Sequence, residues 1–66
     1  MEYTNSQIRL LIDEHIHSER DRRILYRRLV DGIPFEPLAE EFGLSPRHVK
    51  TLVYKAEKIL FKHLPG

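Results

Sequence analysis

Apolar residues recur along this chain at intervals of three and four, the spacing of an amphipathic helix, and no alternating strand pattern occurs. A first helix is predicted over residues 6–17, with its cap among residues 4–6. Its apolar face carries Ile8, Leu11, Ile12 and His15, with Leu10 off that face. A second helix is predicted from the capping residue Ser18 to Asp31, where Gly32 permits the left-handed turn that ends a helix. Its apolar face carries Ile24, Leu25 and Leu29.

Two further helices follow, and proline and glycine mark their boundaries. The third is predicted over residues 35–42, between Pro34 and Gly43, with an inner face of Leu38, Ala39 and Phe42. The fourth is predicted to begin after the capping residue Ser45, with Pro46 at its first position. Its apolar stripe consists of Val49, Leu52, Val53, Ala56, Ile59, Leu60 and His63. The connections are short and no repeat occurs, so the pattern predicts one all-α domain of four helices over residues 1–66.

The segment 35–54 has the features of a helix-turn-helix formed by the third and fourth helices. Gly43 can supply a positive φ at the turn, Leu44 is placed to fill its corner, and Ser45 to cap the following helix. Ala39 is small at the point where the two helices would cross. Four polar side chains then point away from the core, namely Arg47, Lys50, Thr51 and Tyr54. In a helix-turn-helix, such positions contact base edges and phosphates.

Composition and charge restrict the classes of function. The chain has 66 residues, of which 41% are hydrophobic and 32% charged, as in a small globular domain. It has no cysteine, which excludes disulfides and Cys-containing zinc sites, and no apolar run that could cross a membrane. The net charge is +1, but after residue 42 only Glu57 opposes Arg47, Lys50, Lys55, Lys58 and Lys62. This basic region suits a polyanion, although a solvated helix face gives the same pattern.

The remaining charged residues and the histidines are expected mainly to stabilise the fold or to face solvent. The arginines of the second helix could touch a DNA backbone, but we expect them to pair with neighbouring carboxylates, namely Glu19, Asp21 and Asp31. His15 and His17 lack further ligands at metal-binding spacing, so no metal and no other cofactor is expected. His48, beside Arg47, either reaches a phosphate or is solvated. The carboxylates within residues 36–41 lack a partner base, so the chain is not expected to be an enzyme.

A wider set of residues carries a family resemblance. These residues are Glu19, Arg20, Ile24, Leu25, Gly32, Leu38, Ala39, Leu44, Ser45, Val49, Lys50, Lys55, Ala56 and Leu60. Through them, residues 19–64 resemble the fourth conserved region of bacterial RNA polymerase sigma factors, the region that reads the −35 promoter element. The chain is also similar to short sigma-region-four-like proteins of phage or mobile-element type.

The resemblance implies roles for several residues. It implies DNA contacts from the major groove by three residues of the fourth helix, Arg47, Lys50 and Thr51. It also places Ser45 near a phosphate. Pro34 and Pro37 depart from the capping residue and glutamate of the family, so the third helix is expected to start late or with a distorted first turn. Residues 1–18 lie outside the resemblance, and a complete sigma factor is not expected.

We therefore interpret the chain as a cytoplasmic, sequence-specific DNA-binding regulator of transcription, with a recognition helix that starts at Ser45 and enters the major groove of double-stranded DNA. The candidate DNA-binding residues are Ser45, Arg47, His48, Lys50, Thr51, Tyr54 and Lys55. The alternative is an interaction module that binds RNA polymerase or another protein without binding DNA.

A homodimer is a further expectation, because regulators of this size commonly present two copies to two half-sites. The candidate partner surface lies on the first helix and at the end of the fourth, and it consists of Leu10, Phe61 and Leu64. The same residues could instead pack on one another within a single chain or contact the polymerase. No membrane partner is expected.

Overall fold

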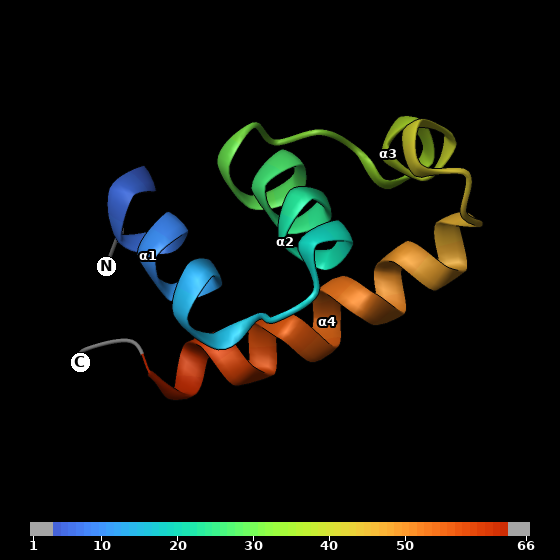
Figure 1. Ribbon diagram of the computed structural model, residues 1–66. Helices are drawn as coiled ribbons and strands as arrows, with labels where there is room; N and C mark the ends of the chain where they lie inside the picture. Colours follow the sequence, from blue (N-terminus) through green and yellow to red (C-terminus); the bar gives the residue numbers. More distant parts are fainter. Residues whose placement is uncertain (1–3, 64–66) are drawn as a thin grey trace.

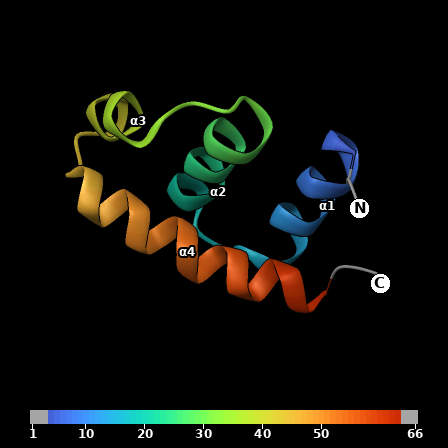
Figure 2. The same ribbon diagram turned by 180° about the vertical axis from the view of Figure 1, so that it is seen from behind.

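The computed structural model describes residues 4–63, and within this range the chain is all-α, as predicted. The elements are α1 (Asn5–His15), α2 (Glu19–Leu25), the π-helical segment η1 (Tyr26–Val30), α3 (Phe35–Phe42) and α4 (Pro46–Lys62). Helices α1, α2 and α3 lie along one side of the long α4, in an elongated unit of 34 × 20 × 17 Å (Figures 1 and 2). No helix within these residues is long and apolar enough to cross a membrane.

Helix α1 begins one residue earlier than predicted and ends two residues sooner. Thr4 caps it by a reciprocal pair of bonds: the Thr4 hydroxyl accepts from the Gln7 amide at 3.2 Å, and the Gln7 side chain accepts from the Thr4 amide at 2.8 Å. The helix ends at His15 because Ile16 adopts an extended backbone. The Ile16 side chain is 7% exposed. This change of direction therefore buries an apolar residue that lies outside the predicted apolar face.

The second helical segment starts as predicted but does not continue as one regular helix. The Ser18 hydroxyl accepts from the Asp21 amide at 3.3 Å and caps α2. The Asp21 carboxylate pairs with Arg20 at 3.1 Å, and no bond from it to the Ser18 amide is found. From Tyr26 onward the backbone widens into a π-helix, in which the Asp31 amide donates to the Tyr26 carbonyl at 3.1 Å. The prediction of a single α-helix as far as Asp31 was therefore wrong.

The connection to α3 follows the expected turn chemistry. Gly32 has φ +73°, and Ile33 folds back so that its amide donates to the Arg27 carbonyl at 3.0 Å. Helix α3 then begins at Phe35, and the Leu38 amide donates to the Pro34 carbonyl at 3.2 Å. Its first turn is thus closed as in an ordinary helix, and the expectation of a late or distorted start was wrong.

The turn between α3 and α4 has the predicted geometry. Gly43 has φ +66° and ψ +31°, and its amide donates to the Glu40 carbonyl at 3.2 Å. The Leu44 amide donates to the Ala39 carbonyl at 2.9 Å. These two bonds form a Schellman motif, which satisfies the last carbonyls of α3. The Ser45 hydroxyl then accepts from the His48 amide at 3.1 Å and caps α4, so that three residues connect the two helices.

The core is made by one face of each helix, and each buried side chain in it is apolar. Its members are Ile12, Ile16, Ile24, Leu25, Leu38, Ala39, Val49, Val53, Ala56 and Leu60. Burying a valine, leucine or isoleucine side chain contributes about 1.5–3 kcal/mol, so this core is the main source of stability. Within the predicted stripe of α4, Leu52 is half-buried and packs against this core, whereas Ile59 is 43% exposed and His63 is also exposed. Ile59 borders a shallow depression beside the α1–α2 connection, which covers it only in part.

Candidate nucleic-acid interface

Helix α4 has one buried face and one exposed face. The buried face carries Val49, Val53, Ala56 and Leu60, and it packs against α1, α2 and α3. At 100° per residue, the opposite side must face solvent. All seven predicted DNA-binding residues are exposed, one at the N-cap of α4 and six on the helix itself. They are Ser45, Arg47, His48, Lys50, Thr51, Tyr54 and Lys55.

The hydroxyl groups at the start of α4 already have local partners, which determines what they can still do. The Ser45 oxygen accepts from the His48 amide, so its proton remains free to donate to an anion. The Thr51 hydroxyl donates to the Arg47 carbonyl at 3.0 Å. Thr51 therefore presents an acceptor oxygen and a methyl group to solvent. The two hydroxyls thus offer opposite hydrogen-bonding character on one surface.

An aromatic residue of α3, Phe35, lies between the cations of this region. The Lys50 Nζ is 5.7 Å from the centre of the Phe35 ring, and the Arg28 guanidinium carbon is 4.2 Å from it. The Tyr54 ring meets Phe35 edge-on, with centroids 6.1 Å apart and an interplanar angle of 75°. Phe35 therefore contacts two predicted site residues. The sequence pattern did not single it out, because an apolar residue at a helix start reads as an ordinary core residue.

The cations of α4 and those of the second helical segment differ in their partners. Arg20, Arg23 and Arg27 form ion pairs, with Asp21, Glu19, Asp31 and Glu41 as their partners. Arg22 and Arg28 donate to the backbone carbonyls of Ile16 and Ile33. Within residues 4–63, by contrast, no carboxylate lies within 4.0 Å of the α4 cations, which are Arg47, Lys50, Lys55, Lys58 and Lys62. The positive charge of the exposed face of α4 is therefore not neutralised by the described part of the chain.

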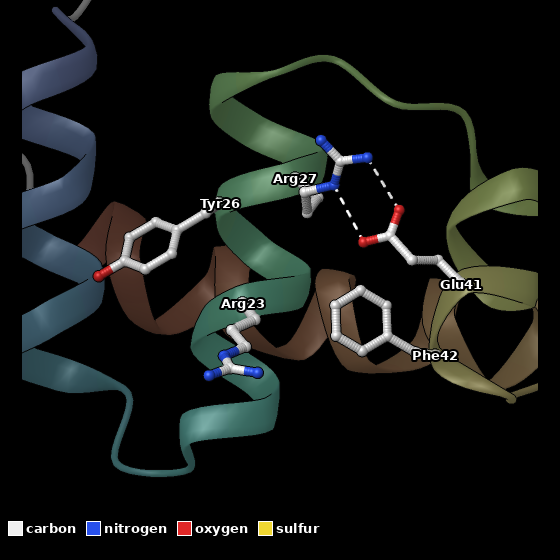
Figure 3. A pocket seen from close by; sticks show the side chains of 5 residues that line it. All are labelled: Arg23, Tyr26, Arg27, Glu41 and Phe42. Carbon is white, nitrogen blue, oxygen red and sulfur yellow. Dashed lines mark hydrogen bonds and ion pairs between the residues drawn. The ribbon is translucent and has the colours of Figure 1, made fainter.

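A shallow groove of about 550 Å³ lies on another face, between the second helical segment and α3 (Figure 3). Arg27 crosses one side of it and donates two hydrogen bonds to Glu41, at 2.8 and 3.1 Å. These bonds, together with one to Asp31, raise the pKa of Arg27 above its ordinary value. The Phe42 ring and Arg23 also line the groove (Figure 3). Sequence reasoning did not predict this surface, because the two paired residues are 14 positions apart.

Two histidines lie together at the end of the molecule where α1 and α4 meet. The rings of His15 and His63 are stacked, with centroids 3.8 Å apart and an interplanar angle of 10°. His15 is half-buried, as expected for the edge of the core. Within the described residues, no group of three or more histidine and carboxylate side chains is placed to hold a metal ion. The pair is a packing contact between α1 and α4.

The candidate partner surface is exposed where the structure describes it. Leu10 is 61% exposed and Phe61 is 60% exposed, whereas Leu64 lies outside the described residues. Both described side chains are therefore largely exposed. The alternative that Leu10 and Phe61 are buried by packing on one another is therefore wrong.

No protein-family model matches this chain, and neither a curated protein nor a solved structure shows significant similarity to it. The resemblance to sigma region four therefore stays a prediction that rests on the residues quoted for it.

Proposed function

We propose that the chain binds duplex DNA through the exposed face of α4 and acts as a sequence-specific regulator of transcription. The observation that carries the proposal is the row of cations on this face that have no carboxylate partner within residues 4–63. Such a surface attracts the phosphate backbone and releases its counterions. A helix with its side chains is about 10–12 Å across, which matches a major groove about 12 Å wide.

The chemistry of the individual side chains suits this role. Arg47 and Lys50 can donate to the guanine edge or to phosphates, and Thr51 offers a methyl group for contact with thymine. Tyr54 offers a ring and a hydroxyl beside them, held by Phe35. Ser45, His48 and Lys55 are exposed on the same surface and offer hydrogen-bond donors to phosphates. The recognition element thus begins at the Ser45 cap.

The resemblance to sigma region four supports the regulatory part of the proposal. It suggests that the regulated process is bacterial transcription, which takes place in the cytoplasm, and that RNA polymerase is a further partner. Binding to the polymerase alone is the second candidate function. The groove of Figure 3 favours it, because a phenylalanine and two arginines line an open surface away from the exposed face of α4.

Substitution of Arg47 or Lys50 by alanine tests the main proposal. Both side chains are exposed, so each variant should keep its melting temperature within about 2–4 °C of the wild type. The affinity for duplex DNA should fall, and the slope of log affinity against log salt should flatten by about one unit per lost phosphate contact. Arg23→Ala is the matched control, because it removes one exposed arginine that pairs with Glu19 on α2.

Two outcomes separate the candidate functions. If the Arg47 and Lys50 variants bind every duplex like the wild type, the assigned recognition face is wrong. If the wild type binds no duplex at low or moderate salt but binds purified RNA polymerase, the interaction module replaces the DNA-binding regulator.

We further propose that the chain self-associates through the surface that carries Leu10 or Phe61. Both side chains are largely exposed, and covering them in a two-fold dimer would remove apolar area from water. Sedimentation equilibrium over a wide concentration range measures this directly. A mass that stays at 7.9 kDa at every concentration, with and without DNA, contradicts the dimer and leaves this surface to another partner.

A further inference from the structure

The exposed face of α4 continues well past the residues of the proposed recognition element. The helix has 17 residues and is therefore about 25 Å long, roughly twice the width of a major groove. A helix that enters the groove by its N-terminal end has its C-terminal half beyond the groove, above the phosphates of one strand. The side chains of that half therefore determine whether it attracts or repels the backbone.

Lys58 and Lys62 lie in this C-terminal half and share a helix face with the recognition residues. Lys58 is seven positions after Thr51, and Lys62 is four positions after Lys58, which are intervals that return to the same side of a helix. Both lysines are exposed. The sole acidic residue of α4, Glu57, is half-buried and lies off this line.

Neither lysine stabilises the described part of the fold through a polar contact. The arginines of α2 and η1 either pair with carboxylates or donate to backbone carbonyls. Lys58 and Lys62 form no ion pair and no side-chain hydrogen bond within residues 4–63. Two unneutralised cations four residues apart, about 6 Å along the axis, are complementary to neighbouring phosphates.

We propose that Lys58 and Lys62 bind the phosphate backbone of duplex DNA beside the major groove, and so extend the binding surface over the full length of α4. The inference rests on the proposed function, because it assumes that the first half of α4 lies in the groove. It assigns different tasks to the two halves of the helix. Residues near Ser45 read the sequence, whereas Lys58 and Lys62 add affinity that is independent of sequence.

The test compares three double variants by titration of labelled random-sequence duplexes between about 50 and 200 mM salt. They are Lys58→Ala with Lys62→Ala, Arg47→Ala with Lys50→Ala, and, as control, Arg20→Ala with Arg23→Ala. All three remove two positive charges, and the control removes them from paired, exposed side chains of α2. Circular dichroism confirms that each variant is folded.

The expected result is that the lysine variant flattens the slope of log affinity against log salt by about two units, whereas the control keeps the wild-type slope. The affinity loss should be the same on all duplex sequences. If the lysine variant keeps the wild-type slope while the Arg47 and Lys50 variant loses it, this inference fails and the proposed function stands. If the wild type binds no duplex, both this inference and the proposed DNA-binding function fail. A control that flattens the slope equally also overturns the inference.

Discussion

Replacing Gly43 should destabilise the domain through the backbone alone. The residue has φ +66°, and a Cβ added there would meet no atom within 4 Å, so no steric overlap contributes. An L-residue in this left-handed conformation costs roughly 1–2 kcal/mol. The smaller freedom of alanine in the unfolded chain offsets about 0.4–1 kcal/mol of that. We therefore expect Gly43→Ala to lower the free energy of unfolding by about 1 kcal/mol, and Gly43→Val, which is β-branched, to lower it by more than that.

Thermal and urea unfolding followed by circular dichroism measure the effect. For a domain of this size, about 1 kcal/mol corresponds to a fall of roughly 4–8 °C in melting temperature. Gly43→Asn is the matched control, because asparagine adds a larger side chain but tolerates the left-handed region. Asn should therefore destabilise the domain less than Ala does. Equal losses for Asn and Ala, or a neutral Gly43→Ala, would refute the assignment of the cost to backbone conformation.

Two further predictions concern the packing of the helices. Leu38 is fully buried where α3 meets α4, so Leu38→Ala should lower the free energy of unfolding by about 2–5 kcal/mol. Chemical unfolding would detect this loss as a lower midpoint concentration of denaturant, with the dependence of the free energy on denaturant unchanged. The Tyr26 hydroxyl donates to the Asp13 carboxylate, and this bond raises the pKa of Tyr26 above 10.0. Its contribution to stability should be complete below about pH 10 and should disappear as the pH rises through the raised pKa, whereas Tyr26→Phe should lack this alkaline loss in pH-dependent unfolding.

Local signals predicted the helix boundaries around the α3–α4 turn. Gly43 adopts the left-handed conformation, and the hydroxyl of Ser45 caps α4. These features depend on residues within a few positions of one another, so the sequence contains all the information they need. With the exception of Ile59, the same holds for the pattern of buried and exposed positions on α4 as far as Leu60. The exposed position of the candidate site follows from that alternation.

Contacts between distant parts of the chain could not be predicted in this way. Ile16 leaves the helix to enter the core, although the period alone would continue α1 past it. The π-helical segment from Tyr26 has no composition that distinguishes it from a regular helix. Phe35 meets Tyr54 only because α3 packs across α4. Each of these features is decided by tertiary packing, which overrides local preference.

The division of charge between two faces connects the fold to the proposed function. Arg27 pairs with Glu41 and so joins η1 to α3 on the groove side (Figure 3). Exposed pairs of this kind add little stability. Helix α3 in turn directs the start of α4 through the Gly43 turn and the Phe35 contacts. Of the three glutamates of α3, Glu41 is held on the groove side by Arg27, whereas the cations of α4 have no carboxylate partner within residues 4–63.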